Sequence, residues 1–134
     1  MQKVYIADDN VEFAEYLAHV ATRHGWDAEI CSNGIKLLEG LQEGDEPALL
    51  LVDINMPQMD GIEVISGLAA LNRPLRLRFM TGGGAPSMEA AKLIAQARDI
   101  DVGDSMHKPL SRDLLKDVLQ TEAGTLAQMQ AQSL

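Results

Sequence analysis

The stretch Leu49-Leu50-Leu51-Val52-Asp53 contains the pattern that decides the fold. Its apolar run is too short to span a membrane and predicts a strand that is buried on both faces, as in a parallel sheet. The turn-forming segment Asn55-Met56-Pro57 follows and Met59-Asp60-Gly61 comes close behind, so the chain is expected to bend sharply after Asp53. In open parallel sheets, ligands bind at the carboxyl ends of the strands. We therefore expect the functional site to form around Asp53.

Strand-like runs alternate with amphipathic helical patterns along the whole chain. The predicted strands are residues 4–7, 27–31, 49–53, 75–80 and a short, poor strand within 101–107. The predicted helices are residues 11–24, 35–41, a helix from 61 to the break at 72–74, residues 87–98, and a last helix with Ser111 as its N-cap. This order predicts an α/β fold, a (βα)5 doubly wound parallel sheet of five strands with helices on both faces.

The bulk composition fits one domain and restricts the classes of function. The chain has 134 residues, of which 46% are hydrophobic, and it carries 11 Lys and Arg against 20 Asp and Glu. The resulting net charge of -9 argues against direct binding to nucleic acid or to an anionic membrane. Cys31 is the only cysteine, which excludes an internal disulfide and suggests a small buried side chain. Without a signal peptide or a membrane-length apolar run, the protein is expected to be cytoplasmic.

Charged and polar residues follow the predicted strands at the edge where the carboxyl ends of parallel strands meet. Asp8 and Asp9 follow the first strand, Asp53 ends the third, Thr81 ends the fourth and Lys108 follows the fifth. Three neighbouring carboxylates repel one another, and a bound cation would relieve that repulsion. All-oxygen ligands suit Mg²⁺ or Mn²⁺ much better than zinc. A simpler alternative is that the Asp8-Asp9 pair only caps the first helix.

The same five residues could also handle a phosphoryl group. A carboxylate can accept a phosphoryl group and form an aspartyl phosphate. A cation on Asp9 and Asp53 would neutralise the phosphoryl oxygens from one side, Lys108 from another, and the Thr81 hydroxyl could donate to a third oxygen.

On these residues the sequence resembles the receiver domain of two-component response regulators, of the stand-alone, chemotaxis-regulator-like kind. The resemblance extends over about residues 3 to 120 and implies the flavodoxin-like strand order 2-1-3-4-5. It leaves residues 121–134, which are rich in Ala and Gln, as a helical tail or the start of a linker. The matching segments are Asp8-Asp9, Asp53, Asn55-Met56-Pro57, Met59-Asp60-Gly61, Thr81 and Lys108-Pro109.

The resemblance also implies a role for each matching residue. Asp53 would be the phosphoacceptor. Asp9, Asp53 and the backbone carbonyl of Asn55 would bind Mg²⁺ directly, and Asp8 would reach the metal through water. Thr81 would supply the switch hydroxyl, and Lys108 would pair with the phosphoryl group.

Two further expectations come from the segment around Lys108. The Lys108-Pro109 peptide is usually cis in this family. The family's switch aromatic usually lies three residues before the lysine, where this sequence has Ser105. A different rearrangement, of the loop that contains Gly82 to Gly84 and of the fourth helix, would then transmit the signal.

The sequence therefore predicts a receiver that takes a phosphoryl group onto Asp53 from a histidine kinase or a histidine phosphotransfer protein. It would act on a downstream protein or on an output domain of a longer chain, and the surface of the fourth and fifth helices would meet that partner. It would catalyse its own phosphorylation and dephosphorylation without being an enzyme for another substrate. Two alternatives stay open: a receiver-like interaction module that is not phosphorylated, and a phosphatase with an Asp nucleophile.

Overall fold

The computed structural model describes residues 1–56, 61–83 and 85–132. Pro57, Met59, Asp60 and Gly84, which the sequence interpretation used, lie outside the described residues. The strands are β1 (Gln2–Ala7), β2 (Trp26–Cys31), β3 (Ala48–Asp53), β4 (Leu75–Thr81), β5 (Asp101–Val102) and β6 (Met106–His107). The helices are α1 (Val11–Arg23), α2 (Gly34–Leu41), α3 (Gly61–Ala69), α4 (Ala85–Ala97) and α5 (Arg112–Gln132).

The strands form one parallel sheet in the order β2-β1-β3-β4-β5. The predicted fold class and strand order are thus confirmed. The last strand differs from the prediction because it is split into two short pieces, β5 and β6, which both pair with β4. The residues between the pieces, Gly103 to Ser105, leave the ladder, although the Gly103 N–H still donates to Leu77 O at 2.8 Å.

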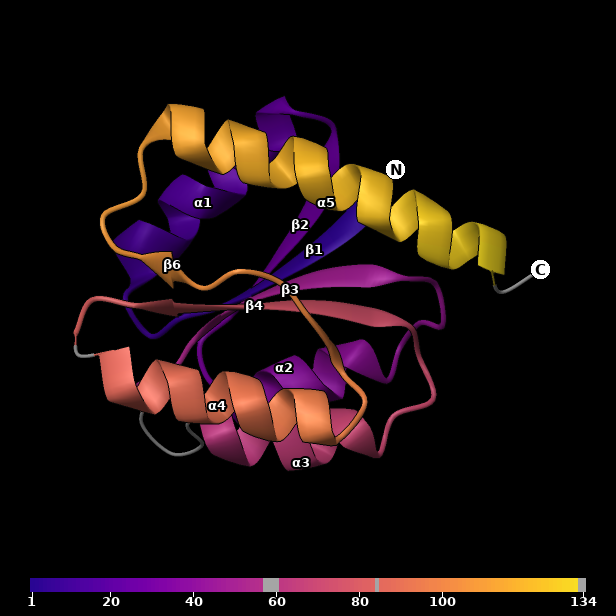
Figure 1. The fold of residues 1–134 in the computed structure, drawn as a ribbon. Helices are drawn as coiled ribbons and strands as arrows, with labels where there is room; N and C mark the ends of the chain where they lie inside the picture. Colours follow the sequence, from indigo (N-terminus) through magenta and orange to yellow (C-terminus); the bar gives the residue numbers. More distant parts are fainter. Residues whose placement is uncertain (57–60, 84, 133–134) are drawn as a thin grey trace.

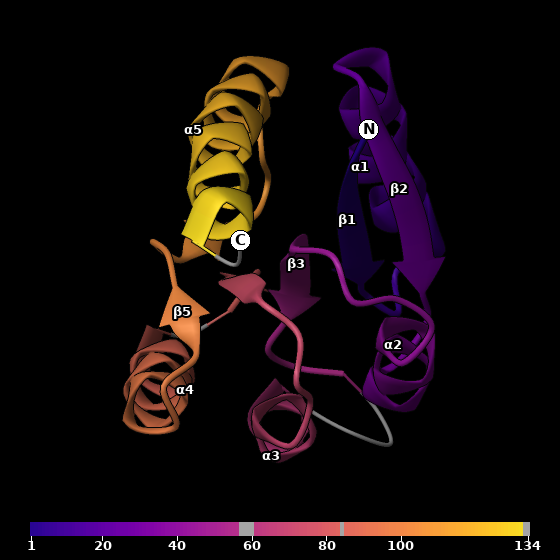
Figure 2. The same ribbon diagram turned by 90° about the vertical axis from the view of Figure 1, so that its right-hand side faces the viewer.

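The sheet separates two layers of helices (Figures 1 and 2). Helices α1 and α5 cover one face, and α2, α3 and α4 cover the other. All six residues of β3 are buried, as its apolar run predicted. Leu49 and Leu51 pack into the core under α1 and α5, whereas Leu50 and Val52 pack into the core under α2, α3 and α4. Asp53, the last residue of β3, is therefore carried by the most buried strand.

The predicted helices are found with small shifts of their ends. The Asn10 side chain caps α1 by accepting from Phe13 N at 3.1 Å, and Gly25 just after the helix has φ +87°, a left-handed conformation that favours glycine. The Ser111 hydroxyl caps α5 by accepting from Leu114 N at 3.1 Å, as predicted. Cys31 is buried, also as predicted, and its burial raises the pKa of the thiol to about 11.

Helix α5 continues without a break through the segment that the sequence assigned to a tail. Glu122, a residue of α5, is fully buried against the sheet and lies between two arginines of β4, with Oε2 at 2.5 Å from Arg78 Nε and 3.1 Å from Arg76 Nε. Leu126, one turn further on, is also buried. Residues 121–132 are thus helical, and this part of the helix packs on the sheet. The division into a domain of residues 1–120 and a tail stays a prediction.

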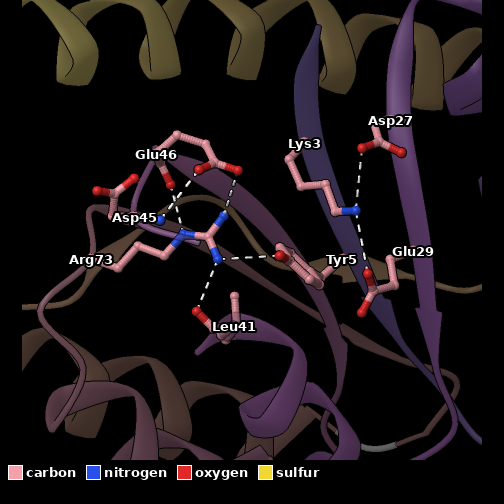
Figure 3. Close-up of polar contacts among 8 residues, drawn as sticks. All are labelled: Lys3, Tyr5, Asp27, Glu29, Leu41, Asp45, Glu46 and Arg73. Atoms are coloured by element: carbon pink, nitrogen blue, oxygen red, sulfur yellow. Dashed lines mark hydrogen bonds and ion pairs between the residues drawn. The ribbon is translucent and has the colours of Figure 1, made fainter. Parts of the chain in front are cut away.

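A second buried charge, Arg73, lies just before β4 on the other face of the sheet, next to α2 (Figure 3). Arg73 donates to Glu46 O at 2.7 Å, to Leu41 O at 3.0 Å and to the Tyr5 hydroxyl at 3.2 Å. It also pairs with Glu46 Oε1 at 3.3 Å. The arginine thereby joins α2, β1 and the loop before β3. It supplies donors to the Leu41 and Glu46 carbonyls at the ends of these segments.

Among the described residues, none of the helices combines the length and the apolar character needed to cross a membrane.

Candidate functional site

Asp53 stands where β3 leaves the sheet. The residue is 6% exposed, and its two side-chain oxygens have different partners. Oδ1 accepts from Asn55 N at 3.0 Å, and Oδ2 lies 3.3 Å from Lys108 Nζ. Burial raises the pKa of the Asp53 carboxyl, and the nearby charge of Asp8 adds to this rise, whereas the Asn55 N–H and the Lys108 ammonium oppose it. The carboxylate is therefore held in place by its partners, but its ionised form is less stable than that of an exposed aspartate.

Asp8 and Asp9 lie beside Asp53, at the end of the neighbouring strand β1. Asp8 is 1% exposed, accepts from Asn10 N at 2.9 Å and pairs with Lys108 Nζ at 2.7 Å. Asp9 is exposed. The cap of α1 is Asn10, so capping does not account for the two carboxylates. One carboxylate oxygen from each of Asp8, Asp9 and Asp53 lies within 4.8 Å of the others.

Lys108 reaches this cluster from the segment after β6. Its backbone N–H donates to Thr81 O at 2.8 Å, which continues the pairing of β6 with β4. The Lys108-Pro109 peptide is cis, as the resemblance implied. Partial burial lowers the pKa of the ammonium, but the ion pairs with Asp8 and Asp53 outweigh this and leave the pKa above its ordinary value. The lysine is thus a fixed positive charge between two carboxylates.

Thr81 and Asn55 complete the set of predicted residues. Thr81 is fully buried at the end of β4, and its hydroxyl oxygen accepts from Gly83 N at 3.0 Å. Among the residues that the structure describes, the hydroxyl donates to no acceptor, so its proton can bond a group that binds at the carboxyl edge of the sheet. Asn55 has an exposed side chain, and its backbone N–H holds Asp53. The structure thus gathers the predicted side chains at one edge, from the ends of β1, β3, β4 and β6.

The acidic cluster fits a hard divalent cation. Three carboxylates converge on one point, and carboxylate oxygens are the ligands that Mg²⁺ and Mn²⁺ prefer. Two of them, Asp8 and Asp53, are buried, where like charges repel strongly. Lys108 supplies only one positive charge for three carboxylates. The ionised site therefore carries a net negative charge, which favours the binding of a divalent cation.

Two features of the site were not foreseen from the sequence. Phe13, on α1, has its ring centroid 4.6 Å from Lys108 Nζ. Ser105, at the position of the family's aromatic, has a buried hydroxyl oxygen without a hydrogen-bond partner in the part of the chain that the structure describes. Helical periodicity indicates which residues share a helix face but not which distant residue packs over that face, so it could not reveal the contact between Phe13 and Lys108. Ser105 lies between two short strands, where no periodic pattern reports burial.

Comparison with known proteins gives a consistent result. A family model described as "Response regulator receiver domain" matches residues 4–120. The response regulator receiver protein CpdR of Brucella abortus is 34% identical over 89 residues, which cover 66% of this chain and 72% of that protein. The sporulation initiation phosphotransferase F of Bacillus subtilis is 25% identical over 119 residues, with 89% and 91% covered. Some other curated relatives are longer, and the chain spans as little as 28% of their length.

The fold is likewise shared with solved structures. A CheY-like response regulator receiver domain protein from Methanospirillum hungatei superposes with a TM-score of 0.80 at 24% identity, and the match covers 95% of this chain and 98% of that one. At this identity the similarity concerns the fold, and the site rests on the geometry described above.

Proposed function

The chain belongs to the response regulator receiver family, a family of phosphoryl-accepting signalling domains, and from this premise we propose that Asp53 is its phosphoacceptor. The observation that carries the proposal is the convergence of Asp8, Asp9, Asp53 and Lys108 from three separate segments on one point. Asp53 is the only one of the three carboxylates that ends the central strand, and its Oδ2 faces the lysine.

Receiver domains bind Mg²⁺ at an acidic pocket, and the cluster described here has the matching ligands. We assign Asp9, Asp53 and the Asn55 carbonyl as direct ligands of Mg²⁺ or Mn²⁺ and Asp8 as a ligand through water. A cation bound there would neutralise charge on the oxygens of the incoming phosphoryl group.

The residues of the chain would then share the transfer. One Asp53 carboxylate oxygen forms a bond to phosphorus while the bond from phosphorus to a histidine nitrogen of the donor breaks. Lys108 exchanges an Asp53 oxygen for a phosphoryl oxygen, so that its charge stays paired. The Thr81 hydroxyl donates to another phosphoryl oxygen. Attack of water on phosphorus later breaks the bond from phosphorus to the Asp53 oxygen, which restores the carboxylate and releases inorganic phosphate. The chain thus acts on its own aspartate and is not an enzyme for a separate substrate.

The partners follow from this chemistry as proposals. The phosphoryl donor is a histidine kinase or a histidine phosphotransfer protein, and the receiver of the signal is a downstream protein or an attached output domain. Exposed apolar side chains on α4 and α5, namely Leu93, Ile94 and Leu114, support the proposal that this surface meets the partner. A domain of residues 1–120 and a cytoplasmic location stay predictions from the sequence.

One observation favours a second candidate, a receiver-like interaction module without phosphorylation. The position of the usual switch aromatic holds Ser105, so the family's usual coupling between that aromatic and Thr81 is absent from this sequence. The family match and the intact acidic cluster weigh against this candidate, and the family match also weighs against the phosphatase alternative.

The test is the intact mass of the protein after incubation with acetyl phosphate, with and without Mg²⁺. We expect a phosphoryl adduct that needs Mg²⁺ and is lost in Asp53→Asn. Asp117→Asn, which removes an exposed carboxylate on α5, is the matched control and should be phosphorylated like the wild type. An adduct that persists in Asp53→Asn would contradict the assignment of Asp53. If neither acetyl phosphate nor a phosphorylated histidine phosphotransfer protein gives an adduct, the interaction module is favoured.

A further inference from the structure

An aromatic side chain of α1 lies directly against the lysine of the site. The Phe13 ring centroid is 4.6 Å from Lys108 Nζ, within the range of a cation–π contact. Phe13 is half-buried, so its ring is partly shielded from water. The Asn10 cap fixes the start of the helix by accepting from Phe13 N itself, and it thereby determines where this ring stands.

A second aromatic ties the same helix to the segment that carries the lysine. Tyr16 packs against Phe13 with ring centroids 6.3 Å apart. Its hydroxyl donates to Leu110 O at 2.9 Å, two residues after Lys108, and Leu110 is buried. The segment around Lys108 therefore contacts α1 twice. Its backbone accepts the hydrogen bond from Tyr16, and the Lys108 ammonium lies over the Phe13 ring.

The three groups around the ammonium differ in one important property. Asp8 and Asp53 are carboxylates of the acidic cluster, so a dication bound there would compete for their oxygens and repel the lysine. The Phe13 ring is an uncharged π-face that does not bind hard cations through oxygen. Of these three contacts, it is the one that metal binding leaves intact.

We propose that Phe13 is a positioning residue for Lys108, whose ring keeps the ammonium over the site when a metal engages the carboxylates. Phosphoryl transfer needs the positive charge near the phosphoryl oxygens before the reaction, since a pre-placed charge costs no reorganisation in the transition state. This inference rests on the proposed role of Lys108 in phosphorylation.

The first test compares phosphorylation rates of two variants at saturating Mg²⁺. Phe13→Leu keeps an apolar side chain without a π-face, whereas Phe13→Tyr keeps the ring. With acetyl phosphate as donor, we expect Phe13→Leu to be slower by about two- to fivefold, the factor expected for a cation–π contact at a partly exposed site. Phe13→Tyr should restore the wild-type rate. If Phe13 contributed only apolar packing, Phe13→Leu would be phosphorylated at the wild-type rate. Equal rates for Phe13→Leu and wild type would therefore overturn the proposal.

The second test does not depend on activity. A side chain stacked on a ring experiences its ring current, so the ε-methylene protons of Lys108 should resonate upfield in the proton NMR spectrum of the wild type. The shift should persist when Mg²⁺ is added and disappear in Phe13→Leu. An unshifted Lys108 signal in the Mg²⁺-loaded wild type would overturn the proposal even if a variant failed to fold.

Lys108→Met separates this inference from the function on which it rests. If Lys108→Met is phosphorylated as fast as the wild type, the role of Lys108 fails and the inference fails with it. If Lys108→Met is slow while Phe13→Leu is as fast as the wild type, the role of Lys108 stands and only the positioning by Phe13 is refuted.

Discussion

Single buried charges show most clearly what individual residues contribute beyond the hydrophobic pattern. Arg73 is 8% exposed, yet its guanidinium has donors enough to serve carbonyl, hydroxyl and carboxylate oxygens at once. From the sequence it was one residue of a break between a helix and a strand. Its burial depends on acceptors that come from distant parts of the chain, and no local pattern reports them.

Replacing Arg73 should therefore cost stability rather than function. In Arg73→Ala the Leu41 carbonyl and the Tyr5 hydroxyl lose a buried partner, and we expect the free energy of unfolding to fall by about 2–4 kcal/mol. The measurement is chemical denaturation followed by the fluorescence of Trp26, which is buried. Arg98→Ala, at an exposed position after α4, should change the value by no more than about 0.5 kcal/mol. An equal effect of both changes would refute the structural role of Arg73.

At the scale of helices and strands, prediction succeeded where a local signal was sufficient. The apolar run of β3 and the Ser111 cap of α5 are local signals, and the structure has both where the sequence predicted them. The first helix is capped by Asn10, whereas the capping alternative from the sequence was the Asp8-Asp9 pair. The split of the last strand into β5 and β6 was not foreseen, because two-residue strands have no period. The packed end of α5 was missed for a different reason: its buried anchor is a glutamate, which the pattern counts as polar.

Glu122 should decide whether the end of α5 stays on the sheet. It is fully buried and pairs with Arg76 and Arg78, so Glu122→Ala would leave two largely buried guanidinium groups with fewer partners, although Arg76 keeps its pair with Asp101. Removal of one member of a buried ion pair typically costs about 3–5 kcal/mol. Because Arg76 and Arg78 keep some solvent contact, we expect the lower end, about 3 kcal/mol, by chemical denaturation.

The helix itself supplies a local readout for this variant. Amide hydrogen exchange in residues 121–132 should become faster in Glu122→Ala, since this half of α5 loses its anchor. Glu89→Gln, an exposed change on α4, is the control and should leave both stability and exchange unaltered. Unchanged protection of residues 121–132 in Glu122→Ala would mean that apolar contacts such as Leu126 suffice to hold the helix.

Considered as a whole molecule, the site is a product of topology. Asp8, Asp53, Thr81 and Lys108 are far apart in sequence, and they meet because parallel strands β1, β3, β4 and β6 all end at one edge. The sequence was sufficient to predict this gathering, since it follows from a parallel sheet and from the residues at the carboxyl ends of its strands. The individual side-chain contacts at this edge depend on side-chain directions that only the folded chain defines. Lys108, for example, pairs with two carboxylates and also lies over an aromatic ring.

This topology brings acidic groups together at a cost that should be visible in the stability of the metal-free protein. Burial, with the charge of Asp8, raises the pKa of Asp53, so the folded state disfavours the ionised carboxylate relative to the unfolded chain. Above the raised pKa the ionised Asp53 therefore lowers stability, and the penalty disappears as the pH falls through that pKa. Without Mg²⁺, Asp53→Asn should be more stable than the wild type at pH 7, and the difference should shrink towards pH 4.

With Mg²⁺ at pH 7, we expect the opposite order of stability, with the wild type more stable than Asp53→Asn. A ligand that binds only the folded state stabilises it by about 2.7 kcal/mol at a hundredfold excess over its Kd, and Asp53→Asn loses one of the proposed ligands. Denaturation of wild type, Asp53→Asn and the control Asp117→Asn, each with and without Mg²⁺ at pH 7 and pH 4, measures both effects. Asp117→Asn should follow the wild type throughout. If Mg²⁺ stabilises Asp53→Asn as much as the wild type, Asp53 is not a ligand. Of the three carboxylates, only Asp8 and Asp9 would then bind the metal at this edge of the sheet.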